Sequence, residues 1–187
     1  MGRQYWFPEY YASAVQRLRV PLGFALIAAY LLAATPGRWS IALGLPVALG
    51  GLVIRAWAAG HLAKDETLAT SGPFAFVRNP LYLGTLVAAL GFGLAAGVWW
   101  LPLLFLLIFV LVYFPVMELE EKHVLKKFPD AAGYVERVPL LLPTQPPLRS
   151  TTRFSWPLYV RNEEYKALGA FAVAAAFLAW RAGWLGI

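Results

Sequence analysis

Residues 81–117 read LYLGTLVAALGFGLAAGVWWLPLLFLLIFVLVYFPVM, and this stretch contains no charged side chain. A helix needs about 20 mostly apolar residues to cross the hydrocarbon core of a bilayer, so the stretch is long enough for two crossings. Gly-Val-Trp-Trp at 97–100 divides it, and tryptophan is enriched at the membrane surface. The stretch therefore predicts a helical hairpin whose two arms, 81–98 and 99–117, cross the membrane in opposite directions.

The composition of the whole chain also indicates a membrane protein. Of its 187 residues, 60% are hydrophobic and 14% are charged, whereas a soluble domain is about 45–50% apolar and about 25% charged. A soluble domain of this size has too little interior to bury the excess. Three further apolar stretches, 20–34, 41–59 and 167–185, raise the expected number of transmembrane helices to five. We expect an all-α fold, an integral membrane helical bundle that forms a single domain over residues 1–187.

The Lys and Arg residues are distributed unevenly around these spans. With the N-terminus in the cytoplasm, fourteen of the sixteen lie on the cytoplasmic side, and this bias sets the orientation of membrane proteins. The same bias accounts for the net charge of +6, so no nucleic-acid partner is expected. No cleaved signal peptide is expected at the N-terminus. The polar segments 60–80 and 118–166 then face the cytoplasm, where a water-soluble cofactor would meet them.

Several kinds of chemistry lack their usual residues in this chain. There is no cysteine, which excludes disulfides, thiolate zinc sites, iron–sulfur clusters and a cysteine nucleophile. Only His61 and His123 supply imidazole, and no metal site is expected. The sequence also lacks a Walker motif, an HExxH zinc motif and a GxSxG nucleophile elbow. ATP hydrolysis, zinc-protease chemistry and serine-hydrolase chemistry are therefore disfavoured.

The third expected span begins with a loop that is suited to an anion. Asn79 is a good helix cap, and Pro80 suits the first position of a helix. The free amide groups at such a helix start favour a carboxylate nearby. An alternative interpretation is that Arg78 only anchors the helix at the membrane surface and that Asn79 only caps it.

A cluster of carboxylates follows the fourth span. Glu118 is expected to face water and to pair with Lys122, four residues further along the helix. Consecutive helical residues point about 100° apart, so at least one of Glu120 and Glu121 should face the bundle. An ionisable group inside a membrane bundle indicates function. Arg55, in contrast, is expected to extend to the cytoplasmic interface rather than into a site.

Together, these segments resemble the isoprenylcysteine carboxyl methyltransferase and phospholipid methyltransferase superfamily of integral membrane enzymes. The resemblance covers about residues 60–143 and rests on four segments. They are ETLATSGPF at 66–74, RNPLYLG at 78–84, the glutamate pair at 120–121 and YVERVP at 134–139. The resemblance implies an enzyme that takes a methyl group from S-adenosylmethionine at a cytoplasmic-side pocket. The implied acceptor is a lipophilic small molecule or a prenylated substrate among the membrane lipids.

The resemblance also implies roles for individual residues. Arg78 matches the motif arginine near the reacting centre, and Glu121 lies beside the glutamate that contacts the cofactor, so these two are the implied catalytic residues. A larger set is implied to bind the cofactor. Its members are His61, Glu66, Thr67, Leu68, Ala69, Phe74, Asn79, Pro80, Leu81, Tyr82 and Glu120.

Two positions depart from the family pattern. Asn79 stands where histidine is more frequent, and asparagine cannot carry a proton at neutral pH. Val116 stands where the isoprenylcysteine enzymes tend to have an arginine suited to the substrate carboxylate. The overall similarity ranks isoprenylcysteine O-methylation first, and N-methylation of a phospholipid such as phosphatidylethanolamine is the alternative.

Two other classes of protein stay open. A nicotinamide-dependent membrane sterol-type reductase has a similar Arg-x-Pro-x-Tyr helix start, although the pair Glu120 and Glu121 favours methyl transfer. A non-catalytic membrane adaptor would leave the carboxylates at the membrane boundary unexplained.

The charge distribution predicts a topology that reporter fusions can test. Fusions at residues 70, 98, 145 and 187 should report the cytoplasm, the outside, the cytoplasm and the outside, because each apolar span reverses the side of the chain. A cytoplasmic signal from the fusion at 187 would contradict the five-span topology and would indicate that 167–185 does not cross.

Overall fold

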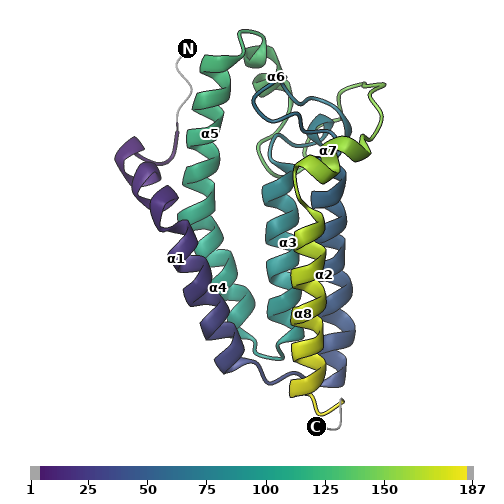
Figure 1. Cartoon of the computed structure of the whole chain (residues 1–187). Helices are drawn as coiled ribbons and strands as arrows, with labels where there is room; N and C mark the ends of the chain where they lie inside the picture. Colours follow the sequence, from purple (N-terminus) through teal and green to yellow (C-terminus); the bar gives the residue numbers. More distant parts are fainter. Residues whose placement is uncertain (1–4, 185–187) are drawn as a thin grey trace.

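The computed structural model describes residues 5–184, and all regular elements within that range are helices. The all-α prediction is therefore confirmed. The longer helices are α1 (Glu9–Ala33), α2 (Arg38–Ala59), α3 (Pro80–Ala95), α4 (Trp100–Ile108), α5 (Phe114–Lys127) and α8 (Tyr165–Arg181). The short elements are the 3₁₀ turn η1 (Gly72–Ala75), the π-helical segment η2 (Phe109–Tyr113), α6 (Ala131–Arg137) and α7 (Trp156–Arg161). Figure 1 shows α1, α4 and α5 on one side of the bundle and α2, α3 and α8 on the other.

Three helical rods are long and apolar enough to cross a membrane. They are α1, α2 and the continuous rod from Trp100 to Lys127, which contains α4, η2 and α5. α3 is apolar but has 16 residues, and α8 has 17. Both run alongside α2 in Figure 1. The chain is thus an integral membrane protein, and the number of five crossings stays a prediction.

Two helices extend beyond the spans predicted from hydropathy. α1 begins at Glu9 rather than at residue 20, and α5 continues to Lys127 rather than ending at 117. Hydropathy detects only the apolar part of a helix, whereas these polar turns are held by contacts with each other. Lys122 Nζ on α5 lies 2.8 Å from Glu9 Oε1 on α1. The predicted last span also shifts, because α8 covers Tyr165–Arg181 and residue 185 lies outside the described residues.

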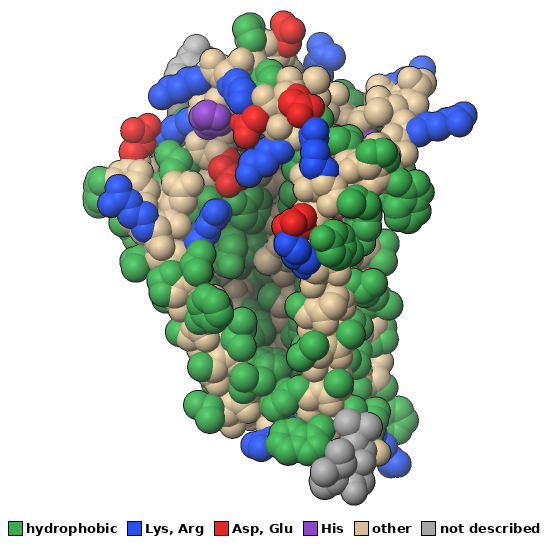
Figure 2. All heavy atoms as spheres, in the orientation of Figure 1, with side chains coloured by type: hydrophobic (Ala, Val, Ile, Leu, Met, Phe, Trp, Pro, Cys, Tyr) green, Lys and Arg blue, Asp and Glu red, His purple; other side chains and the backbone are tan. Residues whose placement is uncertain are grey.

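Charged side chains gather at the end of the bundle that carries α6 and α7, which we call the polar end. Figure 2 shows most of the visible Lys, Arg, Asp and Glu side chains there, while hydrophobic side chains cover much of the remaining face. Large apolar side chains such as Leu32, Val53 and Leu103 are more than half exposed along the rods. An apolar surface of this extent suits hydrocarbon rather than water.

α2 and α3 approach each other closely because small residues line their contact. A Cβ atom added to Gly51 would lie 2.4 Å from the backbone nitrogen of Ala88. One added to Gly91 would lie 2.2 Å from the backbone nitrogen of Ala48. Backbone atoms cannot rotate away as side chains can, so these positions require glycine. Small residues of this kind allow membrane helices to gain packing contacts along their backbones.

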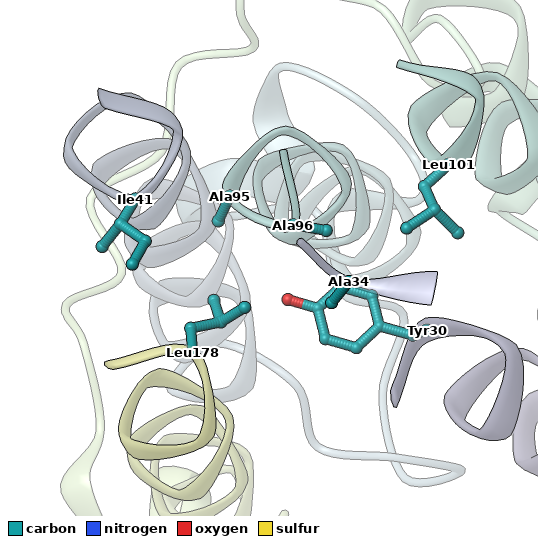
Figure 3. Close-up of a cluster of buried hydrophobic side chains, with 7 residues drawn as sticks. All are labelled: Tyr30, Ala34, Ile41, Ala95, Ala96, Leu101 and Leu178. Carbon is teal, nitrogen blue, oxygen red and sulfur yellow. The ribbon is translucent and has the colours of Figure 1, made fainter. Parts of the chain in front are cut away.

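The predicted hairpin between the third and fourth spans is present at the opposite end of the bundle. α3 ends at Ala95, and Gly97 adopts a left-handed φ of +72° that favours glycine. The backbone N–H of Thr35 donates to the carbonyl of Ala96 at 2.9 Å, which joins the α1–α2 connection to this turn. Figure 3 shows the buried apolar cluster that surrounds this turn. The cluster consists of Tyr30, Ala34, Ile41, Ala95, Ala96, Leu101 and Leu178.

A proline perturbs the rod between α4 and α5. Pro115 has no N–H, so it cannot donate to the Leu111 carbonyl as a regular α-helix requires. The preceding residues form the π-helical segment η2. Tyr11 Oη on α1 donates to that carbonyl at 2.8 Å. The aromatic ring of Tyr11 also stacks on Phe7 with ring centroids 5.5 Å apart. The first turn of α1 is therefore fastened to the wall that η2 and α5 form.

The contact between α2 and α3 predicts a difference between two adjacent glycines. Gly51→Ala should destabilise the fold by about 1–3 kcal/mol, because its methyl group would collide with the α3 backbone. Gly50→Ala has no heavy atom within 4 Å of the added Cβ and should be neutral or slightly stabilising. Thermal denaturation of both variants in one detergent measures the difference, and equal midpoints would contradict the close contact.

Candidate functional site

A cavity of about 1010 Å³ lies at the polar end, between the two sides of the bundle. Its walls come from α1, α2, α3, η2 and α5 and from the segments at 62–69 and 162–164. Figure 2 shows a hollow in the visible face below a group of charged side chains. Ligand pockets have volumes of about 300–1,000 Å³, so this cavity is large enough for a nucleoside-sized ligand.

Most residues implied by the family resemblance line this cavity. Both implied catalytic residues, Arg78 and Glu121, do so. The implied cofactor residues in the lining are Thr67, Leu68, Ala69, Phe74, Asn79, Pro80, Leu81, Tyr82 and Glu120. His61 and Glu66 are not among the lining residues. The fold thus brings the loop before α3, the start of α3 and the glutamates of α5 together around one space.

Arg78 and Glu121 form an ion pair between Nη1 and Oε2. Each side chain is only 6% exposed, so loss of either partner would leave a buried charge. The backbone N–H of Arg78 donates to the Pro139 carbonyl at 2.9 Å, which fixes the loop before α3 against the segment after α6. The pair also borders a second cavity of about 370 Å³. Arg78 is therefore held firmly in the wall between the two cavities.

Glu120 and Glu121 both face the cavity, which confirms that at least one of them points into the bundle. Tyr82 Oη donates to Glu120 Oε1 at 2.8 Å and joins the first turn of α3 to α5. Adjacent carboxylates therefore contact different partners, with Glu120 on the tyrosine and Glu121 on the arginine.

Asn79 and Pro80 start α3 as predicted, but the asparagine side chain does not cap the helix. Asn79 is the residue before the first helical position, which Pro80 occupies. The side chain makes no capping hydrogen bond. Asn79 Nδ2 instead donates to the Leu140 carbonyl at 3.2 Å. The predicted capping role is wrong because the segment after α6 passes beside the loop, and donation from Nδ2 orients the side chain toward that segment rather than toward the free N–H groups of the helix.

The prediction that Glu118 is a solvated partner of Lys122 is also wrong. Glu118 is 6% exposed, and its two carboxylate oxygens accept the backbone N–H groups of Trp6 and Phe7 at 2.9 and 3.1 Å. The chain before α1 covers this face of α5, and its amide groups need acceptors there. Lys122 pairs with Glu9 instead. Spacing along one helix could not reveal this contact between segments more than a hundred residues apart.

Arg55 has a different environment from the one predicted. Instead of extending freely to the interface, it lines the cavity, and its Nε and Nη2 donate to the two oxygens of Glu164 at 3.0 and 2.5 Å. Its Nη1 donates to Thr85 Oγ1 at 2.6 Å. Sequence reasoning missed Glu164 and Thr85 as parts of the cavity wall. The available signal was an arginine within an apolar span, which calls for a buried partner.

His61 and Glu66 hold the loop after α2 rather than the cavity wall. His61 is 8% exposed, and its Nδ1 lies 3.0 Å from Ser71 Oγ. Its ring occupies the space beside Gly72, where an added Cβ would lie 2.5 Å from His61 Cδ2. Burial lowers the pKa of His61. Glu66 pairs with Arg161 of α7 at 2.8 Å.

Charged residues at the mouth of the cavity join the same loop to the end of α5. Lys127 Nζ lies 2.8 Å from Asp65 Oδ1, and this hydrogen bond lowers the pKa of Asp65. His123 Nε2 lies 3.9 Å from the same oxygen. Among the described residues, no group of three or more His, Asp or Glu side chains is arranged to hold a metal ion.

Comparison with known families agrees with the resemblance. The profile of the phospholipid methyltransferase family matches residues 18–131, which is more than half of the chain. The chain therefore belongs to this family, which is part of the superfamily of integral membrane methyltransferases that the motifs indicated. The match begins before the predicted segment 60–143 and ends within it.

The chain is also similar to two bacterial proteins that are named for metal resistance. The cobalt-zinc-cadmium resistance protein CzcN of Cupriavidus metallidurans is 30% identical over 132 residues, which cover 67% of this chain and 60% of that protein. The nickel-cobalt-cadmium resistance protein NccN of Alcaligenes xylosoxydans xylosoxydans is 27% identical over 154 residues, which cover 76% and 72%. The matched part is thus less than two thirds of the CzcN protein. No solved structure matches the chain.

Burial of His61 predicts a pH dependence of stability. Because its pKa is lower in the folded than in the unfolded chain, the unfolded chain binds the proton more readily, and the free energy of unfolding decreases as pH falls through about 6.5. Between about pH 7.5 and about pH 5.5, the melting temperature of the unmodified chain should decrease more than that of His61→Gln. His123→Gln alters an exposed histidine and should retain the dependence. Equal decreases in the unmodified chain and His61→Gln would contradict the assignment.

Proposed function

We propose that this protein transfers a methyl group from S-adenosylmethionine to a lipophilic acceptor in the membrane. One observation carries the proposal: the segments 67–69, 78–82 and 120–121 line a single cavity at the polar end of an apolar helical bundle. Membership of the phospholipid methyltransferase family supports it. The concentration of Lys and Arg at the polar end favours a cytoplasmic orientation of that end, where the cofactor is made.

The side chains around the cavity fit the chemistry of the cofactor. S-adenosylmethionine carries an ammonium group, a carboxylate and a sulfonium group, so it needs both acidic and basic or amide partners. Glu120 supplies a carboxylate for the positive groups, while the amide groups at the start of α3 favour the cofactor carboxylate. Phe74 and Leu68 supply apolar surface for the adenine ring. Bound there, the cofactor supplies the electrophilic methyl group.

The chain mainly has to align the acceptor and exclude water. In the in-line displacement, the bond between sulfur and methyl carbon breaks as the bond to the acceptor forms, and the sulfonium becomes a neutral thioether. A carboxylate acceptor gives an ester and releases no proton, whereas an ammonium acceptor has to pass one proton to a base before its nitrogen can attack, and a carboxylate such as Glu121 would accept it. Alignment of two reactants in a dry site supplies much of the rate in such reactions. The ion pair of Arg78 and Glu121 stiffens the wall beside Glu120 and thereby helps to fix this alignment.

Isoprenylcysteine O-methylation remains the first candidate for the acceptor chemistry, on the similarity of the loop and the glutamate motif. N-methylation of a phospholipid is the second, because the family profile that matches the chain carries that description. Val116 is fully buried beside Val15 and Val112, so the position of the usual arginine offers no cation to a carboxylate. The family match disfavours a nicotinamide-dependent reductase, and a non-catalytic adaptor would leave the charged cavity without a purpose.

Glu120→Gln should weaken S-adenosylmethionine binding about ten- to a hundredfold, because one hydrogen bond to a charged group would be lost. Calorimetric titration of the purified protein with S-adenosylmethionine, and separately with NADPH, measures the effect and separates methyl transfer from reduction. Glu163→Gln removes an exposed carboxylate outside the cavity and is the matched control. Tight binding of NADPH with no binding of S-adenosylmethionine would contradict the proposed function, and equal effects of the two variants would contradict the role of Glu120.

A further inference from the structure

The cavity contains a second ion pair of Arg and Glu, on the wall formed by α2 and by residues 162–164, which we call the α7–α8 corner. Arg55 is 26% exposed, and Glu164 is 10% exposed. Arg55 lies inside the segment that matches the family profile, whereas Glu164 lies beyond its end at 131. The residues of the corner are held independently of this pair, since Asn162 Nδ2 donates to the carbonyls of Ala59 and Leu62 at 2.9 and 2.8 Å. The position of Glu164 beside Arg55 is therefore supported by hydrogen bonds of the corner that do not involve this ion pair.

The two edges of the Arg55 guanidinium have different partners. The carboxylate of Glu164 accepts hydrogen bonds from Nε and Nη2, which form one edge. Among the described residues, Nη1 on the other edge donates to two neutral oxygens, Thr85 Oγ1 at 2.6 Å and the Leu81 carbonyl at 3.4 Å. The Thr85 hydroxyl donates to the same carbonyl at 2.9 Å. A guanidinium N–H and a hydroxyl therefore lie side by side on the cavity wall, and both would form stronger hydrogen bonds to an anion.

Arg78, the other arginine in the cavity wall, is less suited to an anionic group. Arg78 is 6% exposed and is engaged with Glu121. Position 116 holds a buried valine. Arg55 is the more exposed of the two arginines in the cavity wall.

The net charge of the cavity favours an anionic acceptor. Six basic and five acidic side chains line it, so their sum is +1, and the cofactor adds another positive charge. The lining residues in question are Arg55, Lys64, Arg78, Lys122, Lys126, Lys127, Glu9, Asp65, Glu120, Glu121 and Glu164. A pocket with an excess of one sign of charge attracts a ligand of the other sign.

We propose that Arg55 and Thr85 bind the anionic group, a carboxylate or a phosphate, of the lipophilic acceptor. Glu164 is a positioning residue, because it holds one edge of the Arg55 guanidinium so that the other faces Thr85. The inference rests on the proposed function for the identity of the bound molecule as an acceptor. The α7–α8 corner thereby contributes to recognition of the acceptor.

The test is binding of three single-chain probes to the purified full-length protein in a nonionic detergent, with saturating S-adenosylmethionine. The probes are palmitate, hexadecyl phosphate and the neutral hexadecanol, and equilibrium dialysis gives their affinities. At least one anionic probe should bind more tightly than hexadecanol, and the tighter of the two identifies the anion. Thr85→Val should weaken its binding about tenfold. The exposed Thr151→Val is the matched control and should leave it unchanged.

A charge reversal separates binding from structural support. Arg55→Glu and Glu164→Arg should each lower the melting temperature. The double variant should recover most of that loss, because it restores the ion pair, but should still bind the anionic probe about tenfold more weakly. This inference would be overturned if anion binding were unchanged in Thr85→Val and in the double variant. It would also be overturned if the unmodified protein bound hexadecanol as tightly as the anionic probes. Failure of the unmodified protein to bind S-adenosylmethionine in calorimetry would instead overturn the proposed function.

Discussion

The close contact between the backbones of α2 and α3 is the constraint on which the cavity depends. Because Gly51 and Gly91 have no side chain to separate these helices, the start of α3 is held at a fixed position relative to α2. Gly84 extends this contact toward the polar end, because an added Cβ there would lie 2.6 Å from Arg55 Cγ. The stem of Arg55 therefore passes over a glycine of α3, which brings its guanidinium to Thr85. The same packing that joins two apolar helices thus places a charge in the cavity wall.

The other side of the cavity is built differently, with polar contacts in place of close backbone packing. α5 is joined to α1 by Lys122 and Glu9, and to the chain before α1 by Glu118. It is joined to the start of α3 by Tyr82 and Glu120. Hydrogen bonds and ion pairs between long side chains can fix the distance between two groups of helices without bringing their backbones into contact. The result is a space between a rigid pair of helices and a wall attached to it through charged and hydroxyl groups.

The local features of this site could be predicted from sequence, and its long-range partners could not. Apolar length predicted the hairpin, and the helical angle between Glu120 and Glu121 predicted that one of them faces the bundle. Glu118 was misread because its partners are backbone amides more than a hundred positions away, which no side-chain pattern marks. Arg55 was misread for a related reason, since Glu164 follows a long polar segment whose path is not set by helical periodicity.

The segments that sequence patterns describe least well are also those that close the cavity. The family profile covers 18–131, which includes the loop, the start of α3 and the glutamates, whereas Glu9 and Glu164 lie outside it. A division of labour follows if the matched part holds the cofactor and carries Arg55 and Thr85, while the flanking parts position this wall for the acceptor. Ion pairs from the two flanks, to Lys122 and to Arg55, are suited to that second task, because each attaches a separate segment to a common wall.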